Sequence, residues 1–101
     1  MAKKFNKYQL QLTELELKNQ ESTNQTLTFD FENHDDIFNI LERTKNTQGF
    51  SNPNDEIEFF VGLKLFSEVM LRNKKNPLFE EFFPAFVELM KKIKENTANK
   101  Q

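Results

Sequence analysis

The hydrophobic pattern of the chain changes its period within residues 26–41, TLTFDFENHDDIFNIL. Every second residue from Leu27 to Phe31 is apolar, which is typical of a β-strand with one buried face. From Ile37 to Leu41 the apolar residues follow helical spacing instead. We therefore predict a strand that leads into a short helix ending near Lys45.

A polar segment, Asn33-His34-Asp35-Asp36, stands at this change of period. A short polar acceptor before two acids is typical of a helix start, so we predict that Asn33 is the N-cap and that both acids lie in the first turn. The same four residues are a possible polar site, because the single histidine, His34, has the chemistry of a metal ligand or a general base. Three successive residues at a helix start point in different directions, so we favour the structural role.

Residues 5–17 also alternate. The apolar residues from Tyr8 to Leu12 share one parity, and the two leucines that follow take the other. We interpret the change as a β-bulge near Thr13-Glu14, where one extra residue flips the side-chain phase. The wholly polar residues 18–25 are then the turn, and the two alternating runs form an antiparallel hairpin.

Two further helices follow a loop at residues 46–54, in which Phe50 is expected to point inward. The second helix starts either at a capping pair, Asp55 with Glu58, or at Asn52-Pro53, and extends to about Asn73. The third starts after Asn76 with a proline in its first turn, and Pro84 is expected to kink or restart it.

The predicted fold is therefore α+β, with a two-stranded antiparallel hairpin followed by three helices, the third kinked or restarted at a proline. The length of 101 residues predicts one domain over residues 1–101. Residues 1–4 and 95–101 are expected to fray, because they offer little apolar surface to bury.

The second helix is apolar almost all round, which is typical of a central helix or of one that binds another molecule. Beside its wide apolar arc it carries a possible interaction strip, made of Ile57, Val61 and Leu65 with Lys64, Glu68 and Arg72. Gly62 lies inside this helix at a propensity cost of about 1 kcal/mol. We predict that another backbone approaches closely there.

Composition excludes several classes of protein. The chain has no cysteine, so it forms no disulfide, thiolate metal site or cysteine nucleophile. With 14 Lys+Arg against 16 Asp+Glu the net charge is −2, which makes a nucleic-acid partner unlikely and gives no polybasic membrane anchor. No apolar stretch approaches the roughly 18 residues that span a bilayer, and the N-terminal residues lack the pattern of a signal peptide. We expect a cytoplasmic protein without a cofactor.

Several segments resemble a known family. They are Phe31-Glu32-Asn33-His34-Asp35-Asp36-Ile37-Phe38, the block Val61-Gly62-Leu63-Lys64-Leu65-Phe66-Ser67-Glu68-Val69-Met70-Leu71-Arg72-Asn73, and Pro77-Leu78-Phe79 with Pro84, Phe86 and Met90-Lys91-Lys92. The chain thereby resembles, from about Tyr8 to Lys94, the small bacterial family called domain of unknown function three-eight-six-one. The resemblance implies a compact bacterial single-domain protein and assigns no activity, cofactor or catalytic residue.

Three functional hypotheses remain. The first is a non-enzymatic interaction module that binds a second copy or another protein through the Ile57-Val61-Leu65 strip, a hairpin edge, or both. The second is a small ligand-binding protein or enzyme with a pocket near His34, between the hairpin and the helices. The third is a weak nucleic-acid binder that uses the basic clusters at residues 72–75 and 91–94. We favour the first, with no catalytic residue and no metal ligand assigned.

Overall fold

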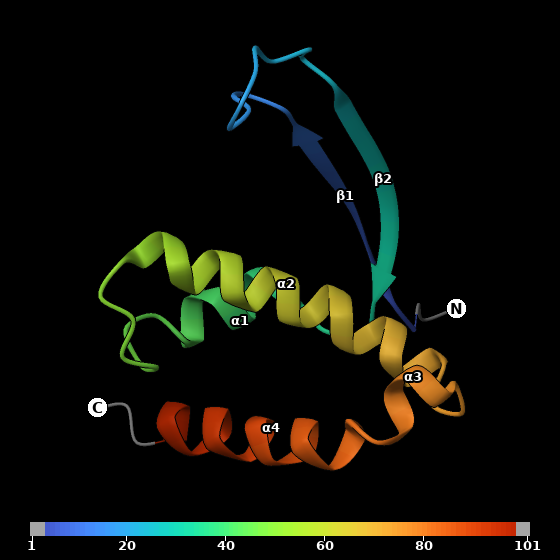
Figure 1. Ribbon diagram of the computed structural model, residues 1–101. Coiled ribbons are helices and arrows are strands. Elements are labelled where there is room, and N and C mark those ends of the chain that lie inside the picture. Colours follow the sequence, from blue (N-terminus) through green and yellow to red (C-terminus); the bar gives the residue numbers. More distant parts are fainter. Residues whose placement is uncertain (1–3, 99–101) are drawn as a thin grey trace. The chain divides into compact units, whose positions relative to one another are not determined.

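The structure is a computed structural model that describes residues 4–98. Its elements are, in order, β1 (Asn6–Thr13), β2 (Thr26–Asn33), α1 (Ile37–Arg43), α2 (Pro53–Arg72), α3 (Pro77–Glu80) and α4 (Phe83–Ala98) (Figure 1). They form two compact units, a hairpin unit that ends at Asp35 and a helical unit that begins at Asp36. The predicted α+β succession of a hairpin and helices is confirmed.

The two strands pair antiparallel in an unbroken register, from Asn6 opposite Asn33 to Thr13 opposite Thr26. Directly opposed residues of an antiparallel pair point to the same face. The apolar residues of both strands therefore share one face, in the cross-strand pairs Tyr8–Phe31, Leu10–Phe29 and Leu12–Leu27. The predicted hairpin is confirmed in this pairing.

The bulge that we predicted at Thr13-Glu14 is wrong. β1 ends at Thr13, and the Glu14 N–H continues the same register by donating to the Gln25 carbonyl oxygen at 2.8 Å. The change of parity marks the end of the strand, because the leucines that follow it lie in the connecting loop. That loop spans residues 14–25 and is longer than the predicted turn at 18–25.

The predicted N-cap at Asn33 is also wrong, because Asp36 caps α1. The Asp36 carboxylate accepts the N–H of Asn39 at 3.0 Å, and no acidic residue lies in the first turn. Asn33 is instead the last residue of β2, and its side-chain oxygen accepts the Asp35 N–H at 2.9 Å. This Asx turn ends the strand and delays the helix by three residues. The helix ends at Arg43, close to the predicted Lys45.

α2 starts at the second of the two predicted positions. The Asn52 side chain accepts the N–H of Asn54 at 2.9 Å, and Pro53 occupies the first helical position. The helix ends at Arg72 with Asn73 as its C-cap, as predicted. The close backbone contact predicted at Gly62 is wrong, because a Cβ built on this exposed glycine meets no atom within 4 Å.

The loop between α1 and α2 is held by polar and aromatic contacts. Glu56 is only 7% exposed, and its two carboxylate oxygens lie 3.1 and 3.2 Å from the N–H of Asn46 that they accept. Asn46 has a positive φ of 61°, a conformation that Asn tolerates better than most residues. Phe50 is half-buried, with its ring 5.5 Å from that of Phe59, so the predicted inward position is confirmed.

The chain restarts as a helix around Pro84, as predicted. Asn76 caps α3 by accepting the N–H of Leu78 at 2.9 Å. Two residues separate α3 from α4, and Pro84 is the second residue of α4, where a missing N–H costs no helical bond. α4 extends through Ala98. Residues 1–3 and 99–101, part of the termini that we expect to fray, lie outside the described residues, and this fraying stays a prediction.

Three of the helices supply the core of the helical unit. The buried cluster consists of Ile40 from α1, of Phe60, Leu63 and Met70 from α2, and of Phe86 and Ile93 from α4. Full burial of one such side chain is worth about 1.5–3 kcal/mol. α2 contributes half of the cluster, which fits the central place predicted for this helix.

Gln48 connects the loop between α1 and α2 to α4. Its side-chain amide donates to the Ile93 carbonyl oxygen at 3.1 Å and to the Thr97 hydroxyl at 3.0 Å, and its own oxygen accepts from Asn96 at 2.8 Å. These bonds tie the last turns of α4 to a segment 45 to 49 residues earlier in the chain.

Candidate interaction surface

The hairpin is strongly amphipathic. Its polar face carries Lys7, Gln9, Gln11 and Thr13 from β1, opposite Glu32, Asp30, Thr28 and Thr26 from β2. On the apolar face the Tyr8 and Phe31 rings stack with their centroids 5.4 Å apart, and the Phe29 ring follows at 6.0 Å from that of Phe31. The two strands thus present a continuous apolar surface, which begins with aromatic side chains and continues with leucines toward the loop.

Exposure of this apolar face increases toward the loop. Tyr8, Leu10 and Phe31 are half-buried. The exposed fractions then rise from Phe29 to Leu27 and Leu12, at 38%, 56% and 64%. We call these last three residues the tip patch. The sequence predicted a buried apolar face, and at the tip patch that prediction is wrong. A contiguous exposed apolar patch is typical of a binding surface.

The loop beside the tip patch is organised by Glu14. One oxygen of its carboxylate accepts the Thr23 N–H at 2.6 Å, the Ser22 hydroxyl at 2.9 Å and the Thr23 hydroxyl at 3.1 Å. These bonds lower the pKa of Glu14 below its ordinary 4.5, first through the Thr23 N–H and then through the Ser22 hydroxyl. The charged carboxylate therefore holds the two ends of the loop together at neutral pH.

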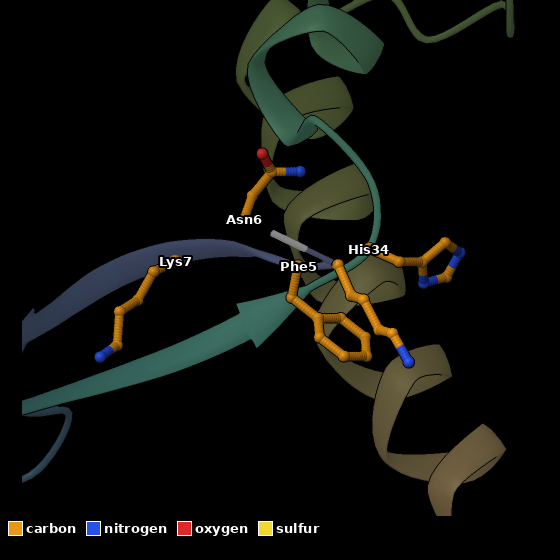
Figure 2. A pocket seen from close by; sticks show the side chains of 5 residues that line it. Phe5, Asn6, Lys7 and His34 are labelled. Carbon is orange, nitrogen blue, oxygen red and sulfur yellow. The ribbon is translucent and has the colours of Figure 1, made fainter. Parts of the chain in front are cut away.

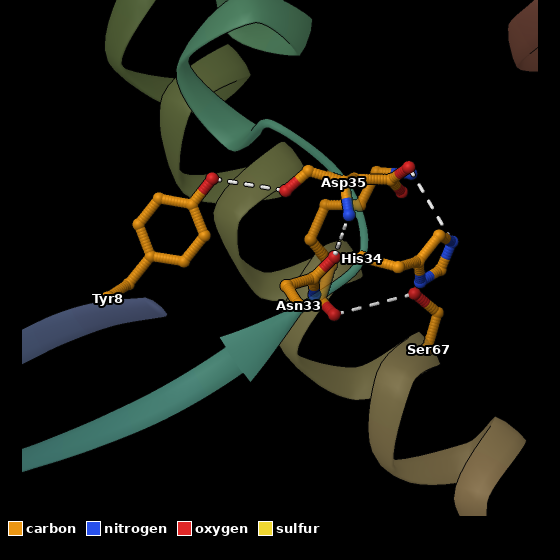
Figure 3. Close-up of polar contacts among 6 residues, drawn as sticks. Tyr8, Asn33, His34, Asp35 and Ser67 are labelled. Carbon is orange, nitrogen blue, oxygen red and sulfur yellow. Dashed lines mark hydrogen bonds and ion pairs between the residues drawn. The ribbon is translucent and has the colours of Figure 1, made fainter. Parts of the chain in front are cut away.

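The residues of the possible polar site make local contacts, several of them with Asp35. Figure 3 shows the Asn33 side chain accepting the Asp35 N–H, and the Tyr8 hydroxyl donating to the Asp35 carbonyl oxygen at 3.0 Å. His34 Nε2 lies 3.5 Å from Asp35 Oδ1, and its side chain is 52% exposed. Asp36 is the cap of α1. Within residues 4–98, no three His, Cys, Asp or Glu side chains gather as potential metal ligands.

A hollow of about 410 Å³ lies beside His34, lined by Lys4, Phe5, Asn6 and Lys7. All five residues belong to the hairpin unit. The Lys7 side chain extends along the strand while the His34 ring points the other way (Figure 2). Ligand sites use a few polar groups that converge on the ligand, and the side chains of Lys7 and His34 do not converge.

The possible interaction strip on α2 has mixed exposure. Ile57 and Arg72 are exposed, Val61, Leu65 and Lys64 are half-buried, and Glu68 is buried. Its role in binding stays a prediction. The basic cluster at residues 72–75 lines a second hollow, of about 430 Å³, with Leu71 and Asn76. In the cluster at 91–94, Lys91 lies 3.7 Å from the Glu88 carboxylate.

The tip patch was not singled out from the sequence. Alternation shows which residues share a face, but it does not show what covers that face. A signal was nevertheless present, because only two alternating runs occur in the chain and a two-stranded sheet leaves both edges open.

These features define a small α+β protein with an amphipathic hairpin and a helical unit. The chain belongs to the family DUF3861, described as a domain of unknown function with a solved structure, whose sequence signature matches residues 6–95. The family resemblance seen in the sequence is thereby confirmed.

One solved structure is similar over most of its length. It is the crystal structure of a protein of unknown function from Pectobacterium atrosepticum SCRI1043, which is 37% identical, with a TM-score of 0.80, over 90% of this chain and 98% of that one. No curated protein matches the chain. Among the described helices, none is both long and apolar enough to cross a membrane. Neither the family nor the related structure carries a named activity.

Proposed function

We propose that the protein is a non-enzymatic interaction module that self-associates through its hairpin. The observation that carries the proposal is the tip patch, where Leu12, Leu27 and Phe29 are exposed together at one end of the apolar face. Leu12 and Leu27 are directly opposed across the two strands, so these side chains form one surface. Isolated exposed apolar residues are ordinary, but a contiguous patch is typical of a protein interface.

The size of the sheet supports the same conclusion. A two-stranded hairpin is marginally stable in water unless further strands or another element pack on it. Association with a second copy supplies such a partner, and twofold homodimers are the commonest assemblies of soluble proteins. A dimer of this hairpin buries apolar surface that the single chain exposes.

Two exposed phenylalanines of the helical unit support an interface less well. Phe66 and Phe82 on the helical unit are about as exposed as Phe29. Their rings, however, already pack against one another with centroids 5.9 Å apart, and Phe66 also contacts Phe79 at 6.0 Å. Leu78 of α3 is 75% exposed, so it serves as a control for the substitution of an exposed leucine outside the hairpin.

The polar residues support a binding role over a catalytic one. The segment Asn33–Asp36 is engaged in a turn, a helix cap and a histidine–carboxylate contact. The hollow beside His34 is lined by residues of the hairpin unit alone, and its Lys7 and His34 side chains point in different directions. General acid–base chemistry needs groups within hydrogen-bond reach of one reacting atom.

Sedimentation equilibrium over a range up to high micromolar concentration tests the proposal. We expect a mass of twice the 12.1 kDa chain, and we expect Leu12→Ser to weaken association by about 1–2 kcal/mol of lost burial. Leu78→Ser removes an even more exposed leucine from α3 and should leave the mass unchanged. A mass of one chain at high micromolar concentration would reject the proposal.

A further inference from the structure

The register of the hairpin shows which backbone groups point to the outer edge of β1. The Glu14 N–H donates to the carbonyl oxygen of Gln25, its directly opposed residue. Residues of an antiparallel strand alternate between bonding the neighbour and pointing away from it. The even-numbered residues of β1 therefore bond β2, and Lys7, Gln9, Gln11 and Thr13 direct their N–H and carbonyl groups to the outer edge. In the described part of the chain, no further strand pairs there.

The two edges of the hairpin differ in charge. On β1 the outward-directed positions include one charged residue, Lys7, at the end of the strand. On β2 the corresponding positions include Asp30 and Glu32. Pairing of two β2 edges gathers four carboxylates on one face of the junction, which is unfavourable, whereas pairing of two β1 edges brings no like charges together at its centre.

The β1 edge also lacks the features that protect exposed strands. Natural edge strands are usually short, bulged, interrupted by proline or charged in the middle. β1 is eight residues long, keeps an unbroken register, contains no proline and is uncharged from Tyr8 to Thr13. Such an edge is well suited to strand addition.

We propose that a second copy of this chain pairs with the outer edge of β1, so that two hairpins form one four-stranded antiparallel sheet. The proposal rests on the proposed self-association and names its contact. In the proposed register the twofold axis passes beside Leu10. This register pairs all four outward-directed residues with the second copy and keeps the two apolar faces on the same side of the sheet. Gln9 then lies opposite Gln11 of the second copy, Lys7 opposite Thr13, and Tyr8 opposite Leu12.

This pairing gives the backbone and both faces of β1 a contact with the second copy. It forms about eight backbone hydrogen bonds, two for each of the four bonded positions. On the polar face, glutamine amides meet across the junction, where they can donate and accept. On the apolar face, Tyr8 of one copy covers the exposed Leu12 of the other, and the two apolar faces become continuous.

Two matched proline variants test which edge is used. Gln11 and Thr28 are directly opposed, and both direct their N–H outward, Gln11 from the β1 edge and Thr28 from the β2 edge. Proline at either position removes an outward donor and leaves the bonds within the hairpin intact. We expect Gln11→Pro to weaken the dimer roughly 10- to 100-fold through the two bonds lost by symmetry, and Thr28→Pro to leave its mass unchanged.

A pair of charge variants tests the register without a proline. Gln9→Lys with Gln11→Glu places opposite charges across the proposed junction, and its lysine also lies opposite Asp30 within the hairpin. Gln9→Lys with Gln11→Lys differs at one position and places like charges across the junction. We expect the first variant to dimerise about tenfold more tightly than the second, as measured by sedimentation equilibrium.

The outcomes separate the two proposals. If Thr28→Pro alone weakens the wild-type dimer, or if neither proline does, the proposed β1 contact is wrong, although self-association itself is not rejected. If both prolines abolish the dimer, the charge variants decide, and equal dissociation constants for them overturn the contact. A mass above two chains also overturns it, because a β1 edge that pairs with a β2 edge is an open contact that extends into filaments. A single-chain mass for the wild type rejects the proposed function itself.

Discussion

Replacement of Gly62 by alanine measures the stability of α2 without a change in packing. Gly62 lies near the middle of the 20-residue helix, and a Cβ at this position meets no atom within 4 Å. Glycine inside a helix costs about 1 kcal/mol relative to alanine. Because no neighbour offsets this gain, Gly62→Ala should raise the free energy of unfolding of the helical unit by about 1 kcal/mol. For a unit of this size the midpoint of thermal unfolding should then rise by roughly 4–8 °C.

Gly49→Ala is the matched control. Gly49 has a φ of 79°, where an L-residue costs roughly 1–2 kcal/mol, so the same substitution should lower the midpoint. Thermal and urea unfolding followed by far-ultraviolet circular dichroism, which reports the helices, measures both variants. An unchanged or lower midpoint for Gly62→Ala, beside the expected loss for Gly49→Ala, would show that another element contacts Gly62 and would refute the reasoning.

Three acidic side chains give further predictions, for stability and for its dependence on pH. Asp36→Ala removes the cap of α1 and should cost about 1 kcal/mol in urea unfolding; an unchanged midpoint would contradict the cap. Glu56→Ala leaves the Asn46 N–H without its buried acceptor and should cost about 1–3 kcal/mol, with a smaller loss for Glu56→Gln, which keeps an oxygen there. The Glu14 carboxyl should titrate below its ordinary pKa of 4.5 by NMR. Because the pKa is lowered in the folded state, the charged group stabilises the loop above that ordinary value, and the contribution is lost as the pH falls through the lowered pKa. Glu14→Gln should remove this pH dependence, and a Glu14 pKa at or above 4.5 would exclude the hydrogen-bonded loop.

Much of the fold follows from local patterns. The alternation around Phe29 and the helical spacing after Ile37 placed the hairpin and the first helix, because each element must bury or present one face. The starts at Asn52 and Asn76 were recognisable because a polar cap precedes a proline, which is favourable only at the first helical position.

The errors occurred where several residues offer the same local chemistry. Asn33 and Asp36 can both cap a helix, and the choice depends on where β2 ends, which the register with β1 determines. A glycine in a helix indicates either close packing against another element or a loss of helix stability that the protein tolerates. Only the atoms around Gly62 distinguish these two explanations. The candidate surface was harder still, since alternation does not show that Leu27, on the apolar face of β2, is 56% exposed.

The bonds of Gln48 have a consequence for the order in which the chain takes shape during its synthesis. All residues of the hairpin precede Gln48 in the chain, whereas its partners near the end of α4 follow 45 to 49 residues later. At a translation rate of about 5–20 residues per second, that interval corresponds to roughly 2–10 s. Hairpins form in about 1–10 μs. A nascent chain therefore has time to form the hairpin before the loop at Gln48 is fixed, so the β1 edge to which we propose that a second copy binds is present before the helical unit is complete.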